Sequence, residues 1–100
     1  MLNLEELNNL HDFTYEQGRN YLLALNFSQS CVNWVQEDNS RPHNWSASTR
    51  FYSPDRTITI KFYTSVCIYG RRPSDSDLLR GNWRGYLTPF LSENPGERPS

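Results

Sequence analysis

The side chains best suited to acid–base chemistry in this chain are its two histidines, His11 and His43. A metal-independent nuclease needs a base, an acid and a cation that stabilises a pentacovalent phosphate. His43 as base, His11 as acid, and Lys61 or Arg50 as the cation would supply these groups. No spacing requires that arrangement, and the motifs of a nucleophile elbow, a phosphate-binding loop or a metal site are absent. We therefore keep a nuclease as a remote alternative, and we expect a non-catalytic protein without cofactor or metal.

A patch of cations and aromatic rings in the middle of the chain is the stronger candidate for function. Its predicted binding residues are Arg50, Tyr52, Lys61, Tyr63, Arg71 and Arg72. Exposed rings between cations can stack single-stranded bases while the cations hold phosphates. Arginine, tyrosine and tryptophan are also enriched at the energetic centres of protein–protein interfaces. The patch therefore predicts a binding surface, either for a protein or for a single-stranded nucleic acid.

Charge is divided unevenly along the chain. Residues 1–40 carry one cation and six acids, whereas residues 41–86 carry eight cations and three acids, a net charge of +5. The whole chain has a net charge of −1 and an isoelectric point near 6.1, well below that of domains that depend on phosphate contacts. Nine of the ten cations are arginine, whose planar fork suits carboxylates as well as phosphates. These facts favour a protein partner, and they leave open that acidic helices and basic strands only complement each other within the fold.

Local patterns predict helices in the first quarter of the chain. A leucine repeat near the N-terminus, with Asn3 and Glu6 spaced as a helix cap and its partner, predicts a first helical turn. Thr14 and Gln17 have the same spacing and predict a second start, ahead of the segment 15–25.

An antiparallel hairpin is predicted in the middle of the chain, after a short strand at 31–36. The turn at 53–56 has proline at its second position, and it would place Tyr52 opposite Thr57. This register collects apolar side chains on one face and polar ones on the other, as in a sheet that is covered on one side. The predicted core consists of Trp45, Phe51, Ile58, Ile60, Phe62, Val66 and Ile68.

Two further elements are predicted after the hairpin. Ser74 and Asp77 have the spacing of a capping box and predict one helical turn. The segment 82–88 predicts a last strand that Pro89 ends, and the polar residues 92–100 predict a disordered tail.

Together these elements predict an α+β fold with a single domain over residues 1–91. An N-terminal helical segment would pack on one face of a three- to four-stranded antiparallel meander. The chain has no apolar run long enough to cross a membrane and begins without a signal-peptide pattern, so we expect a cytoplasmic protein. Cys31 and Cys67 are expected to be buried free thiols. The function we expect is that of a small accessory or regulatory protein that binds a protein partner through the Arg/Tyr-rich sheet face. A homodimer formed through an open edge strand stays possible.

Overall fold

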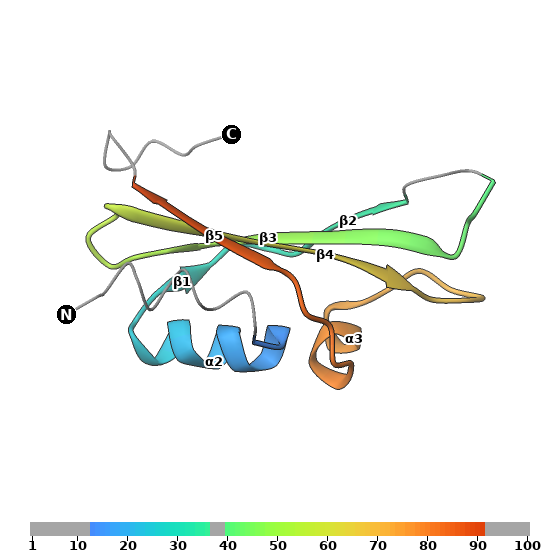
Figure 1. Cartoon of the computed structure of the whole chain (residues 1–100), viewed down its shortest axis with the longest axis horizontal. Coiled ribbons are helices and arrows are strands. Elements are labelled where there is room, and N and C mark those ends of the chain that lie inside the picture. The colour runs from blue at the N-terminus through green and yellow to red at the C-terminus, as the bar shows by residue number, and fades with distance from the viewer. Residues whose placement is uncertain (1–12, 37–39, 92–100) are drawn as a thin grey trace.

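The computed structural model describes residues 13–36 and 40–91, and for residues 86–91 it describes the backbone alone. The elements of this part are α2 (Tyr15–Ala24), β1 (Ser28–Gln29), β2 (Asn33–Gln36), β3 (Asn44–Tyr52), β4 (Ile58–Cys67), α3 (Asp75–Arg80) and β5 (Tyr86–Leu91). The fold is α+β with an antiparallel sheet, as the sequence predicts (Figure 1). The predicted helical turn near Asn3 and the predicted tail at 92–100 lie outside the described residues.

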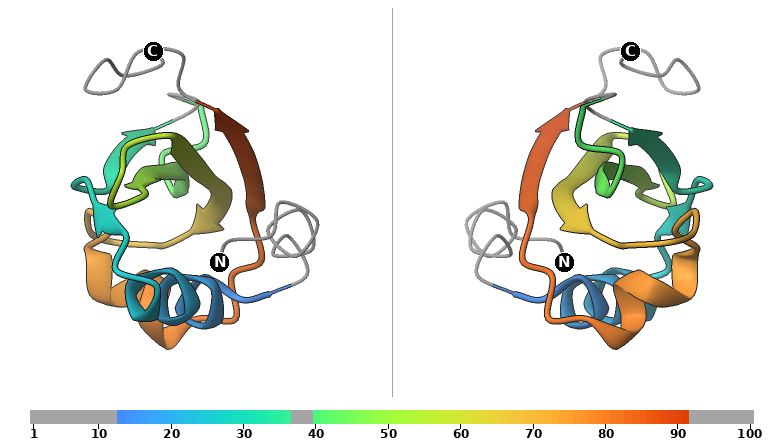
Figure 2. Two further views of the ribbon diagram at one scale, coloured as in Figure 1. Left: turned by 90° about the vertical axis from the view of Figure 1, so that its left-hand side faces the viewer. Right: turned by 90° about the vertical axis from the view of Figure 1, so that its right-hand side faces the viewer.

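All described strands belong to one antiparallel sheet with the order β1-β3-β4-β5, in which β2 also pairs with β3. β1 and β2 lie along the same edge of β3, so they are two pieces of one interrupted strand. The sheet is therefore four strands wide, and β3, β4 and β5 form the predicted meander. Both helices lie on the same side of the sheet, and the opposite side carries neither of them (Figures 1 and 2).

The β3–β4 hairpin has the predicted faces but not the predicted register. Tyr52 lies opposite Thr59 instead of Thr57. A shift of two residues returns every side chain to its own face, because side chains alternate with a period of two. The division into an apolar and a polar face is therefore confirmed although each predicted pair was wrong.

The turn explains this shift. The Arg56 N–H donates to the Ser53 carbonyl at 3.0 Å and closes the predicted turn, and Arg56 itself adopts a left-handed φ of 62°. The Asp55 carboxylate then accepts hydrogen bonds from the Thr57 backbone N–H at 3.1 Å and the Thr57 hydroxyl at 2.7 Å. These bonds hold Thr57 inside the loop, so Ser53 pairs with Ile58 through an N–H···O bond of 2.9 Å.

The core lies between the apolar sheet face and the two helices. Leu22 of α2 and Leu78 of α3 are fully buried against it, and the Tyr15 ring packs 4.8 Å from the Phe62 ring, centroid to centroid. Of the predicted core, Phe51, Ile58, Ile60, Phe62 and Val66 are buried, while Trp45 and Ile68 are partly buried against them. Each fully buried apolar side chain of this size contributes about 1.5–3 kcal/mol.

Both helix starts predicted within the described residues are confirmed. At the start of α2, the Thr14 N–H donates to the Gln17 side chain at 3.1 Å and the Gln17 N–H donates to the Thr14 hydroxyl at 3.3 Å. At the start of α3, the Ser74 N–H donates to the Asp77 carboxylate at 2.7 Å. These contacts satisfy backbone donors that the first helical turn leaves without partners.

The last strand differs from the prediction at both ends. β5 begins at Tyr86, and Pro89 lies within it opposite Ile60 instead of ending it. Among the described strands β5 pairs only with β4, and a proline is tolerated on such an edge because its missing N–H can face away from the neighbour.

Candidate binding site on the polar sheet face

A β-bulge interrupts the edge strand that runs beside β3. The regular pairs on either side of it are Gln29 with Phe51 and Asn33 with Ser48. Residues 30–32 therefore face only Thr49 and Arg50, three residues against two. One surplus residue of this kind disrupts the ladder and bends the strand.

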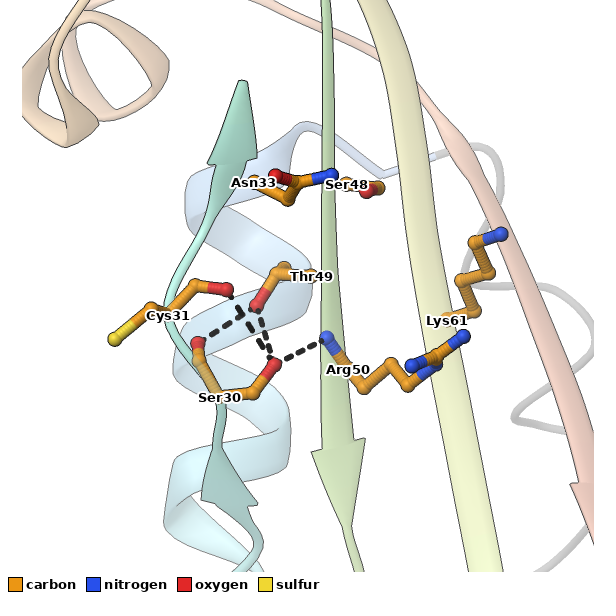
Figure 3. A pocket seen from close by; sticks show the side chains of 7 residues that line it. All are labelled: Ser30, Cys31, Asn33, Ser48, Thr49, Arg50 and Lys61. Atoms are coloured by element: carbon orange, nitrogen blue, oxygen red, sulfur yellow. Dashed lines mark hydrogen bonds between the residues drawn. The ribbon is translucent and has the colours of Figure 1, made fainter. Parts of the chain in front are cut away.

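Ser30 repairs the hydrogen bonding at the bulge. Its N–H donates to the Arg50 carbonyl at 2.9 Å, and its hydroxyl accepts from the Arg50 N–H at 3.0 Å. The Thr49 hydroxyl donates to the Ser30 carbonyl at 2.9 Å (Figure 3). A serine side chain thus replaces a backbone partner, and the strand stays attached to β3 while the sheet opens beside it.

A cleft of about 360 Å³ opens on the polar face next to this bulge. Its lining consists of Ser30, Cys31, Asn33, Ser48, Thr49, Arg50 and Lys61, drawn in Figure 3. Apart from the cysteine, every lining side chain carries a hydrogen-bonding or charged group. The two charged groups are both positive, so the cleft is suited to an anion.

Arg50 and Lys61 lie directly opposite each other on β3 and β4. Like charges in this position destabilise a sheet. Within residues 13–36 and 40–91, no ion pair joins either cation to a carboxylate. Arg50 extends from β3 toward β4, and the Lys61 ammonium turns away from it (Figure 3). The Nε of Arg50 is buried without a hydrogen-bond partner in the described structure, a cost of about 1–3 kcal/mol.

The two predicted tyrosines have different positions. Tyr63 lies on the same polar face, opposite Ser48, and is 37 % exposed. Tyr52 is only 7 % exposed, so the prediction that its ring lies open on this face is wrong. It is flanked by β1 on one side and β4 on the other, and the Arg56 guanidinium lies 5.5 Å from its ring centroid.

Arg71 is held by an internal ion pair. Its two terminal nitrogens donate to the two carboxylate oxygens of Asp77 at 2.9 and 2.6 Å, and Arg80 donates to the same carboxylate at 3.1 Å. Asp77 is 8 % exposed. The Arg71 guanidinium and the Ser74 N–H hold the pKa of the Asp77 carboxyl well below its usual range. We call Arg71, Ser74, Asp77 and Arg80 the Asp77 cluster.

The pair Arg71-Arg72 also lies away from the cleft. Both residues follow Cys67, the last residue of β4. Cys67 is six residues beyond Lys61, which corresponds to about 20 Å along the strand. Arg72 is exposed there. The structure therefore brings Arg50, Lys61 and Tyr63 together and does not bring Arg71 or Arg72 to them.

The groups proposed for a nuclease are also separated. The His43 ring stacks on Tyr69 with centroids 4.6 Å apart, beside the start of β3. Arg50 lies seven residues further along, about 20 Å away along an extended strand. His43 and Arg50 therefore cannot act on one phosphate. His11 lies outside the described residues.

Sequence reasoning did not include Ser30, Asn33 and Ser48 among the site residues, because it did not predict the bulge that opens the cleft beside them. A bulge is recognised when one strand has more residues than its neighbour between the same two cross-strand pairs. Those pairs are known only once the register of the strands is known. The thiols were also placed wrongly, since Cys31 and Cys67 are both exposed. Cys31 lies at the bulge, outside the regular pairing with β3.

Comparisons with known proteins identify no relative of this chain, so the function is inferred from the geometry of the cleft. No helix in the described part of the chain has the length and apolar composition needed to cross a membrane. The chain matches no family model, no curated protein and no solved structure.

Proposed function

We propose that this protein is a small, non-catalytic accessory or regulatory protein that binds a protein partner through the polar face of β3 and β4. The Arg50–Lys61 pair carries the proposal. Two cations lie at directly opposite positions on neighbouring strands and line a polar cleft, with no carboxylate paired to them in the described part of the chain. An acidic group of a partner would relieve their repulsion and accept from the Arg50 guanidinium.

The surroundings of the pair support a protein partner. Both helices lie on the other side of the sheet, so neither of them covers this face (Figure 1). The Tyr63 ring beside the cleft offers an apolar body with a polar end, which suits a protein interface. The protein would act by occupying a surface of its partner.

A cytosolic location is part of the proposal. Cys31 and Cys67 are exposed and free. Exposed thiols persist in reducing compartments, whereas oxidising compartments favour disulfides.

A single-stranded nucleic acid is a less suitable partner. Because Tyr52 is buried, the face around Arg50 and Lys61 retains one of the two tyrosines that were predicted as stacking platforms. The isoelectric point near 6.1 also differs from the basic values of phosphate-dependent domains.

Affinity capture from a nuclease-treated native lysate tests the proposal. The wild type is compared with Arg50→Glu and with Arg41→Glu, which changes the net charge equally but lies before the start of β3 and is exposed. We expect Arg50→Glu to lose partners that the wild type and Arg41→Glu retain, with unchanged circular dichroism. Identical partners in all three samples would contradict a role of this face.

Titration with a single-stranded oligonucleotide separates the alternative. Phosphate-driven binding weakens steeply as salt concentration rises. Tight binding with that salt dependence, lost in Arg50→Glu, would replace the protein partner by nucleic acid.

The interrupted edge strand could also join two copies of the chain. Residues 28–36 contain no charge and no proline, the two devices that most often prevent strand pairing at an edge. A dimer of this kind stays a prediction. Sedimentation over a range of protein concentrations would detect it, and a monomer at every concentration would contradict it.

A further inference from the structure

Four hydrogen-bond donors of the cleft lack partners among the described residues. Two are the charged heads of Arg50 and Lys61, and two are neutral, the side-chain amide of Asn33 and the hydroxyl of Ser48. The other hydroxyls of the lining, on Ser30 and Thr49, are engaged at the bulge. The side chains that carry the free donors all line the cleft.

These donors come from three neighbouring strands. Asn33 lies on β2 opposite Ser48 on β3, and Ser48 lies two residues from Arg50 on the same strand face. Lys61 lies opposite Arg50 on β4. In Figure 3 the Asn33 and Ser48 side chains lie together, and Arg50 and Lys61 extend on the neighbouring part of the face. A group placed between them meets donors from more than one side.

The charge of the cleft indicates which anion fits. Arg50 and Lys61 supply two positive charges, and no described carboxylate is paired with them. One carboxylate of a partner would neutralise only one of them. A phosphate monoester carries about −1.5 to −2 charges near neutral pH and has three acceptor oxygens. A phosphodiester of nucleic acid carries a single charge on each phosphate.

We infer that the cleft between the bulge and β4 is a binding site for a phosphate monoester, presented by a phosphorylated side chain of the protein partner. This inference rests on the proposed function and names the group that the partner presents. The Arg50 guanidinium and the Lys61 ammonium neutralise the phosphate. Ser48 and Asn33 donate to its remaining oxygens and distinguish it from a carboxylate, which offers fewer acceptors.

Peptide binding to the full chain tests this inference. The probes are one short acetylated and amidated peptide with a central phosphoserine, and the same peptide with serine or with glutamate at that position. We expect the phosphoserine peptide to bind about tenfold more tightly than the glutamate peptide, and the serine peptide not to bind. Backbone amide shifts should concentrate at Asn33, Ser48, Arg50 and Lys61. Equal affinity for phosphoserine and glutamate, or no binding of the phosphoserine peptide, would overturn the inference.

The pH dependence of binding supplies a second readout. The second pKa of a phosphate monoester is about 6. Affinity for the phosphoserine peptide should therefore fall several-fold between about pH 7 and pH 5, while affinity for the glutamate peptide stays level. A level profile for the phosphoserine peptide would overturn the inference.

Variants separate the neutral donors from the cations. Ser48→Ala keeps both cations and removes a neutral donor, so it should weaken the phosphoserine peptide more than the glutamate peptide. Arg41→Gln is the matched charge control for Arg50→Gln, and only Arg50→Gln should abolish binding. Inorganic phosphate should compete with the peptide at the same amides. An oligonucleotide that shifts these amides at lower concentration than the phosphopeptide would contradict a monoester site.

Phosphatase treatment of the lysate distinguishes this inference from the proposed function. If capture depends on Arg50 and is lost after phosphatase treatment, both stand. If capture depends on Arg50 but survives the treatment, the phosphate site is wrong and the protein-binding face remains. If capture does not depend on Arg50, the proposed function fails.

Discussion

The Asp77 cluster and the Arg50–Lys61 cleft are built from the same kind of side chain and have opposite electrostatics. In the cluster, Arg71 and Arg80 both donate to one nearly buried carboxylate. In the cleft, Arg50 faces Lys61 and no described carboxylate is paired with either. The cluster connects the end of β4 to α3 within the chain, whereas the cleft presents its charge outward. An arginine therefore indicates a partner only when the fold provides no acid for it.

This contrast predicts separate effects on stability and on binding. Substitutions in the Asp77 cluster should lower the free energy of unfolding and leave partner binding intact. The cluster follows the end of β4, and that end, at Cys67, is six residues or about 20 Å along the strand beyond Lys61. Substitutions in the cleft should weaken partner binding without lowering the free energy of unfolding, because Arg50 and Lys61 already repel each other in the free protein.

The largest effect is expected for Asp77→Asn. This change replaces a charged carboxylate, which accepts from two guanidinium groups and the Ser74 N–H, with a neutral amide that has one acceptor oxygen. Loss of a helix cap together with charged hydrogen bonds should lower the free energy of unfolding by about 2–3 kcal/mol, and the Tm by roughly 10 °C. Urea and thermal unfolding measure both quantities.

Asp75→Asn is the control for that variant. It lies in the same first turn of α3 and accepts one exposed hydrogen bond, from the Trp34 indole at 3.2 Å. Its effect should stay below about 0.5 kcal/mol. An equal loss in both variants would show that the contrast reflects helix charge and not the Asp77 cluster.

The pH dependence of stability should follow from the lowered pKa of Asp77. A carboxyl whose pKa is lower in the folded than in the unfolded protein stabilises the fold above its unfolded value, about 3.9, and loses this effect as pH falls toward the folded value. The stability difference between wild type and Asp77→Asn should be constant near neutral pH and shrink below about pH 4. Urea unfolding at several pH values measures it, and a difference that grows on acidification would be inconsistent with this origin.

A smaller loss of stability is expected for Arg71→Gln. It leaves Asp77 with Arg80 and Ser74 as partners, and the Arg71 side chain is half exposed, so water screens part of the pair. The free energy of unfolding should fall by less than in Asp77→Asn, with binding to the captured partner unchanged. Weakened binding would place Arg71 in the binding surface after all.

The smallest change in stability, and of opposite sign, is expected for Lys61→Glu. The new carboxylate lies opposite Arg50 and converts a repulsive cross-strand pair into an attractive one. Stability should rise by about 0.2–1 kcal/mol while partner binding is lost. Lys61→Gln, which removes the repulsion only, should give a smaller gain. A destabilised Lys61→Glu protein would indicate that Lys61 has another role in the fold.

Much of the fold could be predicted because it depends on short-range patterns. The Thr14–Gln17 and Ser74–Asp77 spacings predict helix starts, since a cap and its partner lie three residues apart. The alternation along β3 and β4 predicts the buried and polar faces, and it places Arg50, Lys61 and Tyr63 on one side.

The candidate site could be predicted only in part. The register depended on the Asp55 hydrogen bonds that keep Thr57 in the loop. Tyr52 has the alternation of an exposed residue and is nevertheless buried, at a position between β1 and β4 with the Arg56 guanidinium near its ring. Arg71 reaches a carboxylate on a separate element, six residues further along the chain.

By itself, the sequence determined where helices begin, which strand residues share a face, and that cations and rings gather on the polar side of one hairpin. These properties involve residues within a few positions of each other. Only the tertiary structure decided that Arg71 is paired, that Tyr52 is covered, and that a bulge opens a cleft beside Arg50. Burial and ion pairing depend on which distant elements meet, and the chain pattern around a single residue does not contain that information.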